Sequence, residues 1–220
     1  MKLLNALLAV LLITLLPSLG WTTAHDELVE RDGLYYPKFS DVPFTGKVTG
    51  RAQGYVKDGI KEGKWVAYHN NGQLYIKGDF KNGKKQGLLV RYFRNGQLKD
   101  EGNYKNDKKE GANVSYFDNG ELKDEGNYKN GKKEGAYVRY FDNGELMYKG
   151  HYNKGKEEGA WVEYHENGQL KRKGNYRNGK KEGAWHECWD NGQWRRQGNY
   201  KNGKKEGAWI ESMSSVSCEQ

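Results

Sequence analysis

Hydrophobic, polar and glycine positions repeat along this chain with a period of 24 residues, from about Gly54 to Ile210. Glycines keep the period at positions 63, 87, 111, 135, 159, 183 and 207. Between the turn signals, apolar side chains follow the period of two that is typical of strands, and the glycine density excludes helices. A repeat of 20 to 50 residues is the signature of an array of small units. The pattern therefore predicts one elongated array without a deep central core.

Each unit contains two turn signals. One is Asn-Gly followed by Gln or Glu, at Asn71-Gly72, Asn95-Gly96, Asn119-Gly120, Asn143-Gly144, Asn167-Gly168 and Asn191-Gly192. The other lies in a lysine-rich segment, at Asn82-Gly83, Asn130-Gly131, Asn178-Gly179 and Asn202-Gly203, with Asn106-Asp107 and Lys154-Gly155 as variants. Asn-Gly tolerates the positive φ at both central residues of a type I′ turn. Each unit is therefore predicted to be two antiparallel strands joined by tight turns.

A two-residue turn at Asn95-Gly96 fixes a register that the sequence itself can test. It places residues of opposite charge across from each other, as directly opposed residues on a sheet face prefer. The pairs are Arg91 with Asp100, Glu163 with Arg172, and Glu187 with Arg196. The same register predicts Phe93 opposite Leu98 and Trp189 opposite Trp194.

The register also sorts the remaining side chains onto two faces. On one face it places a large ring across from a glycine, so that the ring can cover it: Trp65 and Gly78, Tyr137 and Gly150, Trp161 and Gly174, Trp185 and Gly198. On the other face, Val66, Val90, Val114, Val138 and Val162 lie opposite mostly Lys and Glu. The predicted fold class is all-β: a single-layer, twisted, antiparallel meander of 24-residue hairpins.

The repeat divides the chain into an array at 54–211, an N-terminal capping segment at 25–53 and a tail at 212–220. The capping segment contains strand-like residues interrupted by Pro37 and Pro43, which suits short edge strands. Repeat arrays need an atypical terminal unit, because the first regular strand would otherwise expose its pairing edge.

Residues 1–24 are predicted to be a signal peptide. One lysine precedes an apolar run that ends at Leu16 and is short for a transmembrane helix. Thr22 and Ala24 supply the small residues that favour cleavage before His25, and cleavage after Gly20 is the alternative. An uncleaved membrane anchor is the competing interpretation. The expected location is secreted, periplasmic or in the cell envelope.

Composition changes this picture little. Hydrophobic residues make up only 35% of the chain, but aromatics reach 13%, which argues against disorder. The formal net charge is +8 and becomes +7 once the leader with Lys2 is removed. Cys188 and Cys218 would face an oxidising compartment after export. The sequence leaves open whether they form a disulfide that tethers the tail.

The sequence contains no convincing catalytic or metal-binding set. The five histidines are scattered, and His69 and His165 occupy a repeat position that Phe or Trp fills elsewhere. A general base needs a positioned partner, and a zinc site needs ligands at fixed spacing. The glycines recur as turn and strand positions, unlike a phosphate-binding loop. We therefore predict a non-enzyme without cofactors.

The segments Gly174–Trp185 and Gly198–Trp209, which read Gly-Asn-Tyr-Arg/Lys-Asn-Gly-Lys-Lys-Glu-Gly-Ala-Trp, resemble the bacterial variant of the MORN repeat. The resemblance covers about residues 54–210. The entry segment from Asp32 to Val48 is similar to the start of bacterial YwqK-type antitoxins of toxin–antitoxin systems. Membership implies a non-catalytic module for protein contacts, oligomerisation or association with anionic phospholipids.

Two surfaces are candidates for a partner. The first is the set of lysine-rich turns, which would form a basic edge: Lys84, Lys85, Lys108, Lys109, Lys132, Lys133, Lys180, Lys181, Lys204 and Lys205. The second is the aromatic and arginine set near the C-terminus: Trp185, Trp189, Trp194, Arg195, Arg196 and Trp209. Both have a simpler interpretation, since charged turns keep an edge soluble and rings over glycines form a thin core.

We interpret the chain as an exported, non-catalytic scaffold that binds another protein, with an antitoxin or immunity role, and thus a toxin as partner, as its most specific form. The alternative is peripheral binding to an anionic membrane surface through the lysine-rich turns. No specific nucleic-acid partner is predicted. Neither the identity of the partner nor the oligomeric state follows from the sequence.

Overall fold

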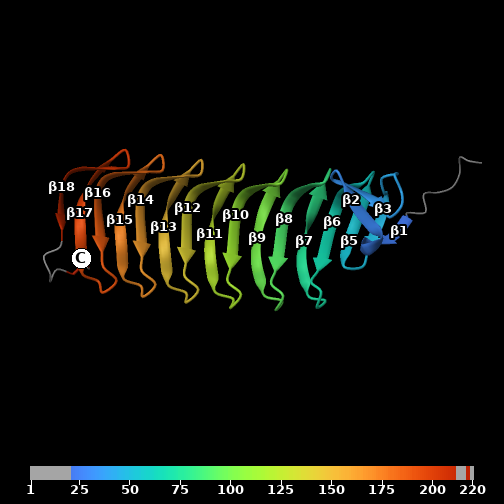
Figure 1. Cartoon of the computed structure of the whole chain (residues 1–220), viewed down its shortest axis with the longest axis horizontal. Helices are drawn as coiled ribbons and strands as arrows, with labels where there is room; N and C mark the ends of the chain where they lie inside the picture. The colour runs from blue at the N-terminus through green and yellow to red at the C-terminus, as the bar shows by residue number, and fades with distance from the viewer. Residues whose placement is uncertain (1–20, 212–216, 219–220) are drawn as a thin grey trace, which may run out of the picture.

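The computed structural model describes residues 21–211 and 217–218. Sixteen strands form one sheet whose neighbours follow chain order, except that β1 lies beside β4. Figure 1 shows the result as a long ribbon with its two described ends far apart. The predicted all-β antiparallel meander is confirmed.

The strands of the main sheet have these bounds: β1 Trp21–Ala24, β4 Gly46–Thr49, β5 Ala52–Lys57, β6 Ile60–Tyr68, β7 Leu74–Lys81, β8 Lys84–Tyr92, β9 Leu98–Lys105, β10 Lys108–Tyr116, β11 Leu122–Lys129, β12 Lys132–Tyr140, β13 Leu146–Asn153, β14 Lys156–Tyr164, β15 Leu170–Arg177, β16 Lys180–Cys188, β17 Trp194–Lys201 and β18 Lys204–Glu211. A second, two-stranded sheet consists of β2 Leu28–Arg31 and β3 Leu34–Pro37. A short 3-10 turn, His25–Glu27, precedes it.

The lysine-rich turns have the predicted geometry. At Asn130-Gly131 both central residues have positive φ, 52° and 78°, and Lys129 pairs with Lys132 across the turn. This is the two-residue type I′ hairpin that asparagine and glycine favour. A glutamate of the preceding strand braces the turn, since the Asn130 amide donates to the Glu110 carboxylate over 2.9 Å.

The other Asn-Gly turns do not have the predicted geometry. Only the glycine has positive φ, as at Gly120 with 92°. The Gly120 amide donates to the Phe117 carbonyl, and the Phe117 amide donates to the Glu121 carbonyl, so the turn is longer than two residues. In these turns the asparagine side chain links one turn to the next. Asn119 Nδ2 donates to the Asp142 carbonyl of the next turn over 2.8 Å.

The longer turn shifts the register at the strand end. The predicted pairs Phe93–Leu98 and Trp189–Trp194 are wrong, because Tyr92 pairs with Leu98 and Cys188 pairs with Trp194. A bulge one residue into the returning strand then restores the predicted alignment. All three charge pairs lie as predicted, with Arg91–Asp100 at 2.8 Å, Arg172–Glu163 at 2.6 Å and Arg196–Glu187 at 2.7 Å.

The rings cover glycines, but not the predicted ones. Trp161 does pair with Gly174 in the backbone register. Its ring, however, leans the other way and fills the space above Gly150 on the preceding strand, where a Cβ atom would lie 2.0 Å from the ring. Trp65, Tyr137, Trp185 and Trp209 behave in the same way. The glycines are therefore required by the ring of the strand that follows them.

The N-terminal end of the sheet is covered. β1 pairs in parallel with β4, and the Thr49 hydroxyl donates to the Thr23 carbonyl over 3.2 Å. Val48 and Val56 are fully buried here, in a cluster with Phe44 and Trp65 against which Tyr35 of β3 packs. Of the expected leader, 1–24, residues 1–20 lie outside the described residues. Its last four residues form β1, so cleavage before His25 would remove that strand.

A disulfide joins Cys188 to Cys218, with the Cα atoms 6.2 Å apart. The Cys218 amide also donates to the Gly192 carbonyl in the turn between β16 and β17. Cys218 of the tail is thus held against the hairpin that precedes β18. This resolves the alternative that the sequence left open.

Candidate functional site

One face of the sheet carries a continuous ladder of rings, which we call the aromatic face. From Tyr137 to Trp209, each Tyr of one hairpin contacts the large ring of the next strand edge-to-face, with centroids 5.0 to 6.1 Å apart. Edge-to-face pairs at this spacing are favourable because ring edges are positive and ring faces negative. The ladder is the core of a single-layer protein and consists of Tyr137, Tyr152, Trp161, Tyr176, Trp185, Tyr200 and Trp209.

Half of the lysines that we predicted to form the basic edge instead lie over aromatic rings of the sheet. Lys133 Nζ lies 3.4 Å from the centre of the Tyr137 ring, and Lys181 Nζ lies 4.1 Å from that of Trp185. Lys205 lies over Trp209 of the ladder, and Lys85 and Lys109 lie in the same way over Tyr104 and Tyr128 in earlier hairpins. Burial lowers the pKa of Lys109, Lys133 and Lys181 below the ordinary value. These five side chains stabilise the aromatic face by cation–π contact and do not project from the edge.

The remaining lysines keep the predicted position. Lys84, Lys108, Lys132, Lys180 and Lys204 are exposed at the first position after their turns. All five turns lie along the same edge of the sheet (Figure 1), and we call these side chains the lysine row. The basic edge thus has half the lysine content that the sequence suggested.

The C-terminal candidates separate into buried and accessible residues. Trp185 is fully buried, so it cannot make the surface contact that we predicted for it. Trp194 is half-buried and pairs with Cys188, while Arg196 is engaged by the Glu187 carboxylate. Trp209 lies on the last strand and is only partly covered.

Trp189 and Arg195 remain available at the surface. Trp189 is 47% exposed, and the Arg195 guanidinium lies 4.4 Å from the centre of its ring. The Glu187 carboxylate lies 3.9 Å from the Arg195 guanidinium and attracts it. The same arrangement recurs in other units, where Lys99 lies over Phe93 and Lys123 over Phe117, but only this unit combines Trp with Arg.

Glu187 is the centre of the charge network at this end. It is 7% exposed and lies within 3.9 Å of Lys181, Arg195 and Arg196. Burial opposes its ionisation, but the hydrogen bond from Arg196 and the three positive charges outweigh this and lower the pKa of its carboxyl. The sequence indicated the Arg196 pair. It did not indicate the approach of Lys181 and Arg195, which depends on the bulge and on the ladder.

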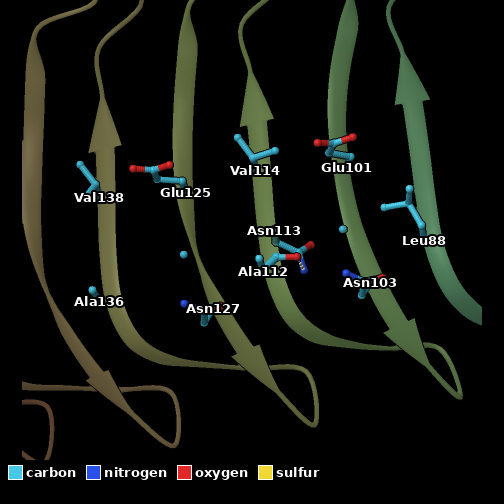
Figure 2. Close-up of a pocket in the computed structure, with 12 residues that line it drawn as sticks. Leu88, Glu101, Asn103, Ala112, Asn113, Val114, Glu125, Asn127, Ala136 and Val138 are labelled. Carbon is cyan, nitrogen blue, oxygen red and sulfur yellow. Dashed lines mark hydrogen bonds between the residues drawn. The ribbon is translucent and has the colours of Figure 1, made fainter.

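The opposite face, which carries the valines, has a shallow trough of about 380 Å³. Figure 2 shows Glu101, Val114, Glu125 and Val138 in one row across β9 to β12, with Ala112 and Ala136 nearer the lysine-rich turns. Val114 separates the two carboxylates, so the trough holds no paired acid and base. Glu101 and Glu125 pair across the strands with Val90, Val114 and Val138 only.

Among residues 21–211 and 217–218, no group of His, Cys, Asp and Glu side chains is arranged to hold a metal ion. His69 and His165 instead contact the carbonyls of Tyr92 and Cys188 in the next hairpin through Nε2, at 3.0 and 3.1 Å. Over the same part of the chain, no helix has the length and apolar character needed to cross a membrane.

The sequence profile of the MORN repeat variant matches five consecutive segments, at 61–82, 85–106, 109–130, 133–154 and 157–178. Together they cover 110 of the 220 residues, and each spans two strands and the longer Asn-Gly turn that joins them, ending at the first residue of the next lysine-rich turn. The chain belongs to the MORN repeat variant family. MORN repeats are non-catalytic modules that bind proteins or membrane lipids, and the five matched repeats make up half of this chain. A comparison with curated proteins gave no match.

Membership sorts the candidate residues. The matched segments end at position 178, so the last MORN-like hairpins, with Trp189 and Arg195, lie beyond them. The glycines recur in every unit, the braced turns recur in most units, and the ring ladder continues through successive hairpins from Tyr137 to Trp209, so these features are framework. A feature specific to this chain has to be sought where the units differ from one another.

Proposed function

We propose that this MORN protein is an exported, non-catalytic scaffold that binds another protein through its C-terminal hairpins, with an antitoxin or immunity role as the most specific form. The observation that carries the proposal is the exposed Trp189 ring with Arg195 stacked on it. Trp and Arg are the residues most enriched among those that dominate binding energy in protein interfaces.

The arrangement favours binding because the two side chains are already ordered. Arg195 contacts both the Trp189 ring and the Glu187 carboxylate, and the disulfide from Cys188 holds the neighbouring backbone. An immobilised side chain loses little further conformational freedom when a partner packs on it, and this raises affinity. A partner with an acidic or aromatic anchor would complement the pair.

Two features support export. The first is the disulfide, because disulfides persist in oxidising compartments and are rare in the cytosol. The second is the apolar leader-like run in residues 1–16. The role of Trp21–Ala24 in β1 favours cleavage after Gly20, the alternative site, because cleavage there preserves the strand that covers β4.

Affinity capture from cell-envelope extracts tests the proposal. The comparison is between the wild type, a Trp189→Ala/Arg195→Ala variant, and a matched Phe117→Ala/Lys123→Ala variant that removes the equivalent stacked pair from a central unit. We expect one or more proteins to be retained by the wild type and the central variant and lost from the C-terminal variant. Identical captured proteins for all three would refute the site.

The antitoxin form makes a stricter demand. The captured partner should arrest growth when it is expressed alone, and co-expression of this MORN protein should relieve the arrest. A captured protein that is harmless by itself would leave the scaffold role intact and remove the antitoxin role.

The second candidate function is binding to an anionic membrane surface, and the lysine row favours it. Five exposed lysines on one edge sum their attraction for negative headgroups, by about 1 kcal/mol for each charge near the surface. Sedimentation with phosphatidylserine-containing liposomes at low and high salt is the test. A variant with glutamine at the five positions should lose binding, and no sedimentation of the wild type at low salt would exclude this function.

A further inference from the structure

The turns at the edge opposite the lysine row are linked to one another along the sheet (Figure 1). In five of them, the asparagine side chain donates through Nδ2 to a backbone carbonyl of the next turn, over 2.6 to 2.9 Å. The donors are Asn71, Asn95, Asn119, Asn143 and Asn167. Each of these turns is therefore held by the turn that follows it.

The last turn of this series, at residues 189–193, has no such link, and we call it the Trp189 turn. Its asparagine, Asn191, donates within the turn to Gln193 Oε1 over 3.1 Å. No further hairpin follows β18 among the described residues, so no next turn offers a carbonyl. The turn that carries the proposed binding residue thus lacks the bond that orders the earlier ones.

Two residues of the tail take the place of the missing turn. The Cys218 amide donates to the Gly192 carbonyl over 2.9 Å, and Ser217 forms an antiparallel bridge with Gln193. The disulfide joins Cys218 to Cys188, which directly precedes Trp189. The Trp189 turn is therefore held at its start by a covalent bond and at its end by backbone pairing.

The cysteine at the start of this turn is specific to its unit. The five earlier units have tyrosine at the same position, at Tyr68, Tyr92, Tyr116, Tyr140 and Tyr164. Cys188 is buried there, at 3% exposure. The ring is thus exchanged for a disulfide in the unit whose turn has no successor to hold it.

We propose that the Cys188–Cys218 disulfide is a redox-dependent clip that orders the Trp189 turn, so that the binding surface is assembled only where disulfides persist. This inference rests on the proposed function, because it concerns the regulation of the same site. A dithiol reductant opens the clip: the bond between the two sulfurs breaks, each cysteine gains a proton and becomes a thiol, and the dithiol is oxidised to its own disulfide.

The reduced tail keeps only the Gly192 hydrogen bond and the Ser217 bridge to the turn. Such bonds add little net stability, because water competes for the same groups. The Trp189 turn then gains conformational freedom, which a partner has to remove on binding at a cost in affinity. Because thiols stay reduced in the cytosol, the chain binds its partner weakly before export and tightly after it.

Amide hydrogen exchange tests the clip without any partner. The Trp189 amide donates to the Gln193 carbonyl and the Gly192 amide to the Trp189 carbonyl, so both report on opening of the turn. Reduction of the wild type should speed their exchange roughly tenfold or more, because the turn becomes a locally unstable segment. Equal exchange before and after reduction would overturn the proposal.

Two controls separate the clip from other effects. The equivalent amides of a central turn, at Phe117 and Gly120, should exchange at an unchanged rate, which shows that the array stays folded. Cys218→Ser should reproduce the faster exchange without any reductant. Adding the reductant to this variant should have no further effect.

The binding arm uses the partner captured by the wild type. Its affinity is compared for the oxidised wild type and Cys218→Ser without reductant, so that disulfides of the partner stay intact. The variant keeps Trp189 and Arg195 and should bind roughly tenfold more weakly, because ordering the turn now opposes binding.

The outcomes distinguish this inference from the function on which it rests. A variant that binds as tightly as the wild type would overturn the redox control and leave the binding site in place. A wild type that captures nothing would remove the proposed function together with its control. The exchange rates would then still decide whether the clip orders the turn.

Discussion

The Asn-Gly dipeptides at 119–120 and 130–131 have the same sequence, but their asparagines have different roles. Asn130 has positive φ and is chosen for its backbone, whereas Asn119 has an ordinary φ and is chosen for its side chain. Asn119 accepts from the Glu121 amide and donates to the Asp142 carbonyl of the next turn. These two roles cannot be told apart from residue type, because both dipeptides suit a type I′ turn equally well.

This distinction predicts opposite responses to glycine. Asn130→Gly should be nearly neutral, while Asn130→Ala should cost about 1 to 2 kcal/mol because alanine disfavours positive φ. For Asn119, both alanine and glycine should cost about 1 kcal/mol through the lost hydrogen bonds. Chemical denaturation of the four variants measures this. If glycine is tolerated equally at both positions, the assignment of roles is wrong.

Burial predicts that substitutions at two nearby tryptophans have different effects on stability. Trp185 lies in β16, and Trp189 lies in the turn that follows β16. Trp185 is fully buried, so Trp185→Ala should destabilise the protein by about 3 to 5 kcal/mol. Trp189 is 47% exposed, and its replacement should cost less than about 1 kcal/mol. Urea unfolding monitored by circular dichroism compares them. Equal losses would contradict the division into framework and surface.

Glu187 predicts a pH dependence of stability. Its pKa is lower in the folded protein than in the unfolded chain, so its contribution is present above its ordinary pKa of about 4.3 and disappears as pH falls through the lowered value. Glu187→Gln should therefore lower Tm near neutral pH and flatten the fall of Tm in acid. Glu125→Gln, exposed on the valine face, is the control. A wild-type acid slope in the Glu187 variant would contradict the account.

At the scale of the hairpin, the sequence predicted what is repeated and missed what is local. Opposite charges at Arg91–Asp100 and Glu187–Arg196 fixed the central register correctly. The bulge after Leu98 depends on turn length, and the direction in which the rings lean depends on side-chain packing. Neither can be predicted from residue type alone. The same limit explains why Lys133 was predicted at the edge although its amine lies on the Tyr137 ring.

For the export that we propose, the first strand predicts where the mature chain begins. Cleavage after Gly20 keeps β1, and cleavage before His25 would expose the β4 edge that β1 covers. Intact-mass measurement of the protein recovered from the cell envelope should give a chain that begins at Trp21. A chain that begins at His25, or one that retains Met1, would show that this strand does not decide the processing site.

At the scale of the whole molecule, each strand of the array contacts its immediate neighbours, so stability is local and the ends are special. The first end is closed by β1 and by a small buried cluster around Val48 and Val56. The last end carries β18, whose outer edge pairs with no strand among the described residues, together with the disulfide and the exposed Trp189. Family membership and architecture were predictable from the repeat. The special character of the last hairpins came only from burial and contacts in the structure.

We propose that the C-terminal hairpins bind a partner while the rest of the array is framework. Hydroxyl-radical footprinting, read residue by residue with and without the captured partner, tests it most directly. The account predicts that Trp189 is labelled in the free protein and protected in the complex, while the turns of the lysine row are labelled equally in both. Protection confined to the lysine row, with Trp189 labelled throughout, would contradict the account.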